Sequence, residues 1–338
     1  MKKILVVNVN WLGDVVFSLP VFKALKETYP HSRISCLAPS RVKEILESSS
    51  YVDQIICYDE RGAHRSFLKK LQLIQDLRRE KFDIAFLLHR SFTRALLVFL
   101  AGIPLRVGYD TKKRGFLLTR AIKPLDSLQH RSDIYLYIIE SFGIEVRDRR
   151  CELLVSDQAL TAVAKILRSY SISTDDFLVV IHPGGNWDLK RWPKEKFAFL
   201  TSRLIKEFQA KVIVVGSQDD ASLAQEIFAL AEHKPVLLTG MLTLKELLAL
   251  MKKASVVVSA DSGPLHLSAA VRTPVIGLFG PTHPAVTGVR GGGRYSMIQK
   301  DVGCNREPCY YLDCPDNICM RSIEVDDVIK EIKKIRNS

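Results

Sequence analysis

The chain has 338 residues, of which 47% are hydrophobic and 25% are charged, with 7 cysteines. This composition excludes a disordered chain, a collagen-like repeat and a small scaffold stabilised by disulfides, and the length predicts two domains. No apolar run approaches the roughly 20 residues of a membrane-spanning helix. The first apolar stretch is interrupted by Asn8, Asn10 and Asp14, which does not fit a secretory signal peptide, so we expect a cytoplasmic protein.

The formal net charge of +12 is unevenly distributed along the chain. Residues 1–170 have a net charge of +10, whereas residues 171–338 have a net charge of +2. A one-sided excess predicts an anionic partner for the first half: nucleic acid, an anionic membrane surface, or a phosphorylated or carboxylated substrate. A solvated basic surface without a partner is the alternative. No nucleic-acid-binding motif is present, so we expect no nucleic-acid partner.

Short β-branched runs alternate with segments of helical periodicity in both halves, which predicts parallel α/β structure. In the first half we predict strands over 3–9, 33–38, 54–58 and 82–88, and helices over 15–29, 41–48, 66–80, 91–101 and 129–142. In the second half we predict strands over 177–182, 211–216, 235–238, 255–260 and 274–279, and helices over 194–208, 221–232, 244–253, 265–271 and 324–335.

The polar segment 169–176 lacks periodicity and is predicted to be a linker, which gives domains 1–170 and 171–338. Two doubly wound domains in tandem leave a cleft between them. Ligands of open α/β sheets bind outside the carboxyl ends of the strands, so the loops that follow strands are the expected functional sites.

The loop after the first strand ends in Gly13 and Asp14. Gly13 permits a tight turn, and a carboxylate at the start of a helix stays ionised because it faces free N–H groups. Asp14 is therefore a candidate general base toward a substrate hydroxyl, with a helix N-cap as the plain structural alternative.

Two loops of the second half have features of phosphate and ribose binding. The loop 182–193 contains Gly184 and Gly185, whose amides could face a phosphate, and Lys190, which could supply the counter-charge. An ordinary turn before Pro193 is the alternative. In the loop 216–220, Asp219 or Asp220 could accept a hydrogen bond from a ribose hydroxyl or simply cap a helix.

The most specific loop follows the strand 255–260 and reads ADSGPLH. The amides of Ser262 and Gly263 at a helix N-terminus predict an anion site, His266 could add a donor to a diphosphate, and Asp261 could bind sugar hydroxyls. A helix cap with a packed histidine is the alternative. The second domain thus suits a nucleotide-sugar donor, and the first suits an anionic acceptor.

The chain resembles the ADP-heptose:lipopolysaccharide heptosyltransferases, glycosyltransferase family 9. The resemblance lies in five segments that occur in the family's order: ILVVNVNWLGDVVFSLPVFKALKETYP (4–30), RVGYDTKKRGFLLT (106–119), HPGGNWDLKRWP (182–193), VVVSADSGPLHLSAAVRTPVIGLFGPTHP (256–284) and CMRSIEVDDVIKEI (319–332). The GYDTKKR segment and the cysteine-rich tail are most similar to heptosyltransferase II.

The resemblance implies a GT-B fold, two Rossmann-like domains facing a cleft. It implies an inverting, metal-independent transfer of heptose from ADP-L-glycero-D-manno-heptose to Kdo-lipid A or heptosyl-Kdo-lipid A, at the cytoplasmic face of the inner membrane, without a cofactor. By residue, it implies Asp14 as the base next to Gly13, and a donor site formed by Gly184, Lys190, Met241, Asp261, Ser262, Gly263 and His266.

An acidic lipopolysaccharide acceptor would explain the basic first half, because guanidinium groups bind carboxylates and phosphates. Its candidate contacts are Arg61, Arg65, Arg90, Arg94, Lys112, Lys113 and Arg114. The residues selected as acceptor-binding are Gly13, Arg61, Arg94 and Arg114. A nucleotide-sugar epimerase of GT-B fold is the alternative function, and it would not need a basic acceptor surface.

Four cysteines, Cys304, Cys309, Cys314 and Cys319, recur at intervals of five residues. Only a folded loop could bring the four thiols together, since this spacing places them on different faces of a helix or strand. A zinc or iron–sulfur site is conceivable, but reduced thiols without a metal are favoured.

Overall fold

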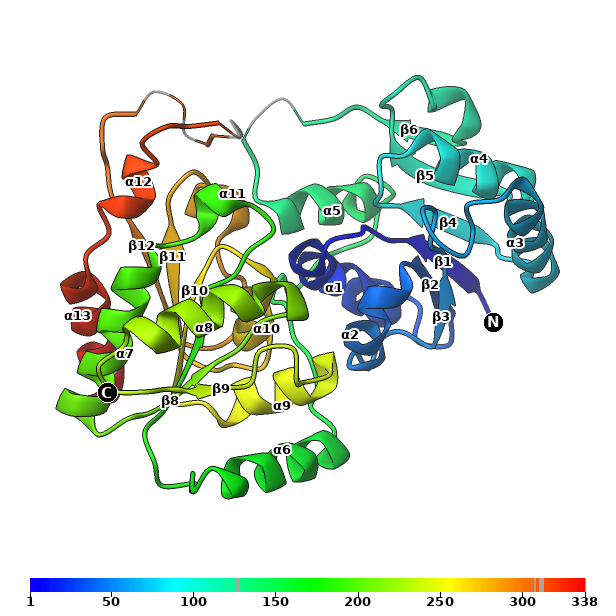
Figure 1. Ribbon diagram of the computed structural model, residues 1–338. Coiled ribbons are helices and arrows are strands. Elements are labelled where there is room, and N and C mark those ends of the chain that lie inside the picture. The colour runs from blue at the N-terminus through cyan, green and yellow to red at the C-terminus, as the bar shows by residue number, and fades with distance from the viewer. Residues whose placement is uncertain (126–127, 305, 307, 310–312, 338) are drawn as a thin grey trace. The chain divides into compact units, whose positions relative to one another are not determined.

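A computed structural model of the chain describes residues 1–125, 128–304, 306, 308–309 and 313–337. The chain divides into two compact units, Met1–Cys151 and Glu152–Ser338. Each unit contains one six-stranded sheet with helices packed against it (Figure 1), and every strand pair described in the two sheets is parallel.

The first unit has the strand order β3-β2-β1-β4-β5-β6. Its strands are β1 (Lys3–Val7), β2 (Arg33–Ala38), β3 (Gln54–Cys57), β4 (Ile84–Leu87), β5 (Leu105–Tyr109) and β6 (Arg120–Ile122), and its helical segments are α1 (Leu12–Thr28), η1 (Ser40–Val42), α2 (Lys43–Glu47), α3 (Phe67–Glu80), α4 (Phe92–Leu100), η2 (Gly115–Leu117) and α5 (Arg131–Glu140).

Strand β1 forms the centre of this unit, and the side chains of Ile4 to Val7 are fully buried. Its β-branched residues suit a strand that is covered on both faces. Helices α3 and α4 bury Leu73, Leu77 and Leu97 in one hydrophobic cluster with Leu5 and Val7 of β1. Helix α1 packs against α5. The carboxyl end of β1 is therefore held by helices from distant parts of the unit.

The second unit has the strand order β12-β11-β10-β7-β8-β9. Its strands are β7 (Leu178–His182), β8 (Lys211–Val214), β9 (Val236–Leu237), β10 (Val256–Ala260), β11 (Val275–Phe279) and β12 (Tyr295–Gln299), and its helical segments are α6 (Asp157–Ser169), η3 (Asp188–Lys190), α7 (Lys194–Phe208), η4 (Gln218–Asp220), α8 (Ala221–Leu230), α9 (Leu244–Lys253), α10 (Gly263–Ala270), α11 (Pro284–Thr287), α12 (Ile318–Arg321) and α13 (Val325–Arg336).

Trp192 anchors the connection between β7 and α7 in the core of the second unit. Its indole is fully buried, donates from Nε1 to the carbonyl oxygen of Ile323 at 2.9 Å, and contacts the ring of Phe197 edge-on at 5.0 Å. Ile323 precedes helix α13, which packs against α7 (Figure 1). The C-terminal helix thereby fixes the end of the loop that contains Lys190.

The structure confirms the doubly wound α/β prediction but divides the chain at a different point. The boundary between the two units lies between Cys151 and Glu152. The residues after it belong to the second unit, because α6 packs against α9 and the amide of Leu153 donates to the carbonyl oxygen of Ala270 at 3.1 Å. The segment 169–176 is a turn inside the second unit, where Ile172 is buried, and it does not link the units. The prediction also omitted strands β5, β6 and β12 and helix α6.

No helix among the residues that the structure describes has both the length and the apolar character needed to cross a bilayer.

Replacing Trp192 with Ala is expected to lower the free energy of unfolding by about 3–5 kcal/mol, because it opens a cavity in the core and removes a buried hydrogen bond. Urea unfolding followed by circular dichroism measures this loss. Phe199→Ala is a matched control, since Phe199 lies on the neighbouring helix α7 with its ring exposed, and its effect should stay within about 0.5 kcal/mol. Equal stabilities for the Trp192 variant and the parent would contradict the anchoring role.

Candidate functional site

In each sheet, the direction in which successive strands are added along the chain reverses at one position. In the first unit this position lies between β1 and β4, and in the second between β7 and β10. Ligands of doubly wound proteins bind outside the carboxyl ends of the strands at such a switch point. The loops that follow these four strands are therefore the candidate functional site, and each unit contributes its own part.

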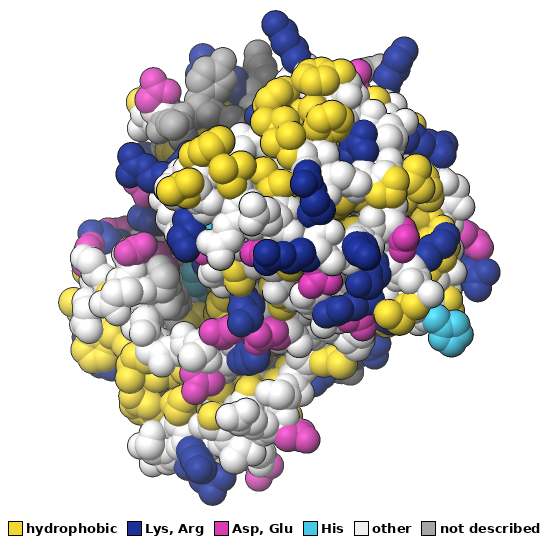
Figure 2. Space-filling view, turned by 90° about the vertical axis from the view of Figure 1, so that its right-hand side faces the viewer, with side chains coloured by type: hydrophobic (Ala, Val, Ile, Leu, Met, Phe, Trp, Pro, Cys, Tyr) yellow, Lys and Arg dark blue, Asp and Glu magenta, His cyan; other side chains and the backbone are white. Residues whose placement is uncertain are grey.

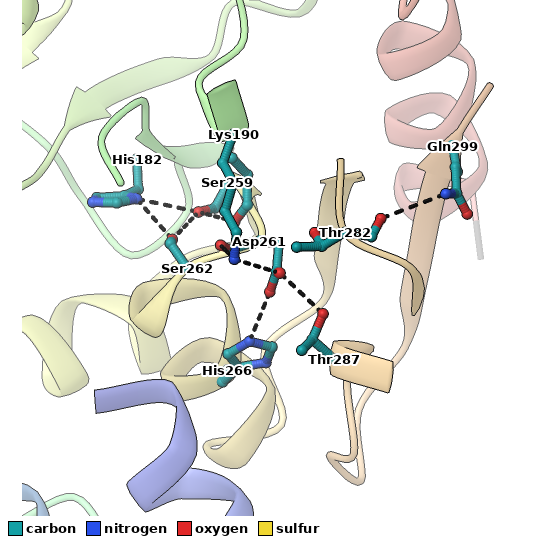
Figure 3. A network of polar contacts seen from close by, with 10 residues as sticks. His182, Lys190, Ser259, Asp261, Ser262, His266, Thr282, Thr287 and Gln299 are labelled. Carbon is teal, nitrogen blue, oxygen red and sulfur yellow. Dashed lines mark hydrogen bonds and ion pairs between the residues drawn. The ribbon is translucent and has the colours of Figure 1, made fainter. Parts of the chain in front are cut away.

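In the second unit, an ion pair joins the loops after β7 and β10. The ammonium group of Lys190, from the turn η3, lies 2.8 Å from Oδ2 of Asp261 and 3.3 Å from its carbonyl oxygen (Figure 3). Asp261 is buried, whereas Lys190 is partly exposed. A cation thus lies at the edge of the switch point, held by a carboxylate beneath it.

The carboxylate of Asp261 accepts from three side chains. Besides Lys190, Oδ2 accepts from the hydroxyl of Thr287 at 2.9 Å, and Oδ1 lies 3.3 Å from Nε2 of His266 (Figure 3). Burial alone would raise the pKa of Asp261, but the hydrogen bond from His266 and the charge of Lys190 outweigh it and hold this pKa well below its ordinary value. Asp261 is therefore ionised at neutral pH.

A second polar network lies below the start of α10. Nδ1 of His182, the last residue of β7, lies 3.2 Å from the hydroxyl of Ser259 and 3.1 Å from that of Ser262 (Figure 3). Burial lowers the pKa of His182 to about 4, so the ring is neutral at pH 7. This network fixes Ser262, the N-cap of α10, although no side-chain hydrogen bond caps that helix. The first amides of α10 are thus oriented as donors to an anion.

The remaining predicted donor-site residues have separate environments. A side chain at Gly184 would overlap the carboxylate of Asp220, so the glycine permits the close packing of that carboxylate. Asp220 forms a capping box with Ser217, whose amide donates to Oδ2 of Asp220 at 2.9 Å. Asp219 is exposed. Met241 is exposed in the turn after β9.

In the first unit, Asp14 lies in the first turn of α1 but is not its N-cap, a position that Trp11 occupies. The hydroxyl of Tyr135, from α5, donates to Oδ1 of Asp14 at 3.0 Å. Burial, reinforced by the negative charge of Asp14, raises the pKa of Tyr135 well above its usual range, so the phenol remains a donor. Gly13 and Asp14 are both partly exposed.

Two arginines hold the loop that precedes Asp14. Arg94 donates to the carbonyl oxygen of Asn8 and to Oδ1 of Asn10, both at 2.5 Å. Arg41 donates to the carbonyl oxygen of Asn10 at 2.9 Å and lies 4.8 Å from the ring centre of Trp11. The backbone before Asp14 is thus held by Arg41 of η1, which lies between β2 and α2, and by Arg94 of α4.

The prediction that Arg94 and Arg114 form an exposed acceptor surface is corrected by their burial. Their relative exposures are 1% and 0%. Arg114 donates from Nε to the carbonyl oxygen of Tyr109 at 2.9 Å and from Nη1 to that of His89 at 2.6 Å. Both guanidinium groups therefore brace loops at the carboxyl edge of the sheet. The other predicted contacts are exposed: Arg61, Arg65, Arg90, Lys112 and Lys113.

None of the four clustered cysteines forms a disulfide within the described part of the chain; Cys304 is exposed and Cys309 is buried. Among the described residues, no group of three or more His, Cys, Asp or Glu side chains is placed to hold a metal. Five residues between Cys304 and Cys314 lie outside the described part of the chain.

Sequence reasoning did not identify Tyr135, Thr287, His182, Ser259 or Arg41 as site residues. Tyr135 and Arg41 belong to elements that are remote from Asp14 in sequence, so only the fold brings them to it. Thr287 lies just beyond the family-like segment 256–284. His182 was visible at the start of the glycine loop, and its position as the last residue of a buried strand was the available signal.

Comparisons with known proteins place the chain in a family. The family model described as glycosyltransferase family 9 (heptosyltransferase) matches residues 70–312. The chain is 28% identical over 295 residues, 84% of each protein, to a lipopolysaccharide heptosyltransferase 2 of Salmonella typhimurium. Because the family model covers more than half of the chain, the chain belongs to glycosyltransferase family 9.

Solved structures support the fold independently. A glycosyl transferase family 9 protein of Veillonella parvula is similar with a TM-score of 0.88 and 21% identity, over 99% of this chain and 97% of that one. The ADP-heptose lps heptosyltransferase II of E. coli is similar with a TM-score of 0.82 and 24% identity, over 99% and 98% of the two chains. The two doubly wound units of a GT-B fold, as predicted, are confirmed.

Replacing Asp261 with Asn is expected to lower the free energy of unfolding by about 1–3 kcal/mol at pH 7, since three donors lose an ionised acceptor. The native pKa of Asp261 lies below its ordinary value of 3.8, so the ionised carboxylate stabilises the fold above that pH and loses this effect as the pH falls further. The stability difference between the two proteins should therefore be constant from pH 5 to 8 and narrow below about pH 4.

Urea unfolding at pH 7 and pH 3 measures this difference, with Asp188→Asn as the control, because Asp188 is almost fully exposed. A difference that widens in acid would show that Asp261 is protonated in the native protein.

Proposed function

We propose that this member of family 9 transfers heptose from ADP-heptose to an anionic lipopolysaccharide precursor of the inner core, with inversion at the anomeric carbon and without a metal ion. The observation that carries the proposal is the Lys190–Asp261 pair at the switch point of the second unit, which offers a cation beside a helix N-terminus to a diphosphate. The sugar and the acceptor class are those of the related lipopolysaccharide heptosyltransferases.

At the donor end, Lys190 and the first amides of α10 supply positive charge and hydrogen-bond donors without a divalent cation. The diphosphate would lie against Lys190 and the amides of Ser262 and Gly263. Nε2 of His266 lies within hydrogen-bond distance of Oδ1 of Asp261. We assign it first to the positioning of that carboxylate, whose oxygens would also accept from heptose hydroxyls. Exposed Met241 and Asp219 are available to the adenine and ribose.

At the acceptor end, Asp14 is the proposed general base. The acceptor hydroxyl gives its proton to Asp14 as its oxygen forms a bond to the anomeric carbon of the heptose. The bond from that carbon to the diphosphate oxygen breaks, and ADP leaves with the electron pair. Positive charge around the leaving group stabilises the charge that develops on it. Tyr135 orients the Asp14 carboxylate by donating a hydrogen bond to Oδ1.

This reaction requires that the carboxyl edges of the two units face one another when both substrates are bound. Domain closure around substrates is common in enzymes whose sites are divided between domains. The acceptor would be Kdo-lipid A or heptosyl-Kdo-lipid A, and relatives named heptosyltransferase 2 favour the latter. A lipid-linked acceptor would bring the chain to the cytoplasmic face of the inner membrane as a peripheral protein.

The family assignment favours this transfer over the nucleotide-sugar epimerase considered from the sequence. The exposed basic side chains of the first unit also favour it, since an epimerase needs no anionic acceptor.

Incubation with ADP-heptose and a panel of truncated core acceptors tests the proposal by mass spectrometry. We expect one added heptose on heptosyl-Kdo-lipid A, release of ADP, and an unchanged rate in EDTA. ADP-heptose consumption without any acceptor product would contradict transfer, and loss of activity in EDTA that Mg²⁺ restores would contradict metal independence.

Replacing Asp14 with Ala is expected to lower kcat by about 10²–10⁴-fold, because the acceptor hydroxyl loses its base. Tyr135→Phe should lower kcat far less, since it removes only the orienting hydrogen bond. Transfer assays with the same acceptor measure both, with circular dichroism as a check of folding. An Asp14 variant that is folded and transfers heptose at the parent rate would exclude this carboxylate as the base.

A further inference from the structure

The basic excess of the chain is concentrated in one segment of the first unit. Residues 61–120 contain 14 Lys and Arg against 4 Asp and Glu, whereas residues 1–60 contain 7 of each. Arg94 and Arg114 are buried in this segment, and the other Lys and Arg side chains are at least partly exposed. The segment runs from the loop before α3 to strand β6, so it includes the three loops that follow β3, β4 and β5.

Large apolar side chains are exposed in the helical turns at the ends of the same three loops. Phe67 and Leu68 begin α3 with exposures of 72% and 77%, and Phe116 in η2 is 74% exposed. Phe92 begins α4, is exposed, and its ring centre lies 6.2 Å from that of Phe116. We call Phe67, Leu68, Phe92 and Phe116 the apolar rim. Phe67 and Leu68 are neighbours in sequence and Phe92 and Phe116 are neighbours in space, and grouped exposed apolar side chains mark interaction sites.

The apolar rim lies at the carboxyl edge of the sheet. Each member follows a strand of the parallel sheet, and parallel strands end at the same edge. The loop that contains Asp14 follows β1 at this edge as well. The apolar rim and the proposed acceptor site therefore lie at the same edge of the sheet of the first unit.

Exposed cations precede each aromatic ring of the rim. Arg61 and Arg65 come before Phe67, and Arg90 comes before Phe92. Lys112 and Lys113, before Phe116, both have left-handed backbone conformations, with φ of 53° and 57°. Two successive residues other than glycine in this region are uncommon. Figure 2, which faces the α3–α4 side of the molecule, shows hydrophobic and Lys or Arg side chains intermixed on the surface.

We propose that the apolar rim and its flanking cations dock the first unit on an anionic lipid surface, with the aromatic rings at the boundary between headgroups and acyl chains. Aromatic rings favour that boundary, and Lys and Arg bind lipid phosphates at the level of the headgroups. A protein partner of opposite charge would match the cations but not the exposed rings among them. The inference rests on the proposed function only in that a lipid-linked acceptor would reach Asp14 from the same surface.

The full-length protein is tested by flotation with vesicles of phosphatidylethanolamine and phosphatidylglycerol, and with phosphatidylcholine vesicles for comparison. We expect binding to the anionic vesicles that weakens with salt, and at least about tenfold weaker binding to phosphatidylcholine. Phe67→Ser/Phe116→Ser should weaken binding to anionic vesicles at least about fivefold, and Lys112→Glu/Lys113→Glu at least about tenfold.

Matched controls lie in the second unit. Phe199→Ser/Ile318→Ser removes two exposed apolar side chains, and Lys206→Glu/Lys330→Glu reverses two exposed charges, so neither should change vesicle binding. Parent protein that does not bind anionic vesicles, or a rim variant that binds them like the parent, would overturn the proposal. A dimer of the parent that Phe67→Ser/Phe116→Ser dissociates, without vesicle binding, would assign the rim to self-association instead. Competition by an oligonucleotide but not by vesicles would assign it to nucleic acid.

Docking and transfer are separated by a deacylated, soluble acceptor. Phe67→Ser/Phe116→Ser should transfer heptose to this acceptor at the parent rate and to the vesicle-embedded acceptor more slowly. An absence of transfer to either acceptor by the parent, together with intact vesicle binding, would refute the proposed function and leave the docking surface in place.

Discussion

The ion pair between Lys190 and Asp261 is the interaction on which the candidate donor site depends. Asp261 is buried, ionised and bonded to three side chains, so it cannot move without leaving charged or polar groups unpaired. The position of Lys190 is also fixed by Trp192, two residues later. The Trp192 indole is buried in the core and donates a hydrogen bond to Ile323, two residues before α13. The hydrophobic core and the C-terminal helix thus determine where the cation lies at the carboxyl edge of the sheet.

In the first unit, the loop that leads to the candidate base is held in place by cations, whereas a carboxylate holds Lys190 in the second unit. Arg94 and Arg41 bind the backbone and the side chain of the loop after β1, so that Asp14 leaves this loop at a defined place and meets Tyr135. Arg94 and Arg114 bind no carboxylate in hydrogen bonds that the structure describes. His89, half-buried beside them, has its pKa lowered to about 3 by partial burial and by their charges. These charges give this edge a positive potential, which the proposed anionic acceptor would require.

Sequence reasoning located the loops well and the roles of single side chains less well. The predicted helices over 194–208 and 244–253 match α7 and α9, because amphipathic periodicity and caps are local signals. Strands β5, β6 and β12 were missed, since β5 and β6 contain Arg and Gly among their apolar residues, and short edge strands are specified by pairing. Arg114 was predicted to be exposed, but charge alone does not reveal that its guanidinium is buried and donates to the carbonyl oxygens of Tyr109 and His89. The sequence singled out the Asp261 loop as a candidate, but it did not reveal the ion pair with Lys190, which joins residues 71 positions apart.

Calorimetric titration of ADP tests the central claim, that Lys190 holds the donor diphosphate, most directly. The account predicts that Lys190→Ala weakens ADP binding by about 10–100-fold, that Lys190→Arg retains most of the affinity, and that Lys206→Ala on α7 binds like the parent. Thermal unfolding of each variant checks that the second unit remains folded. A folded Lys190→Ala protein that binds ADP as tightly as the parent would contradict the account.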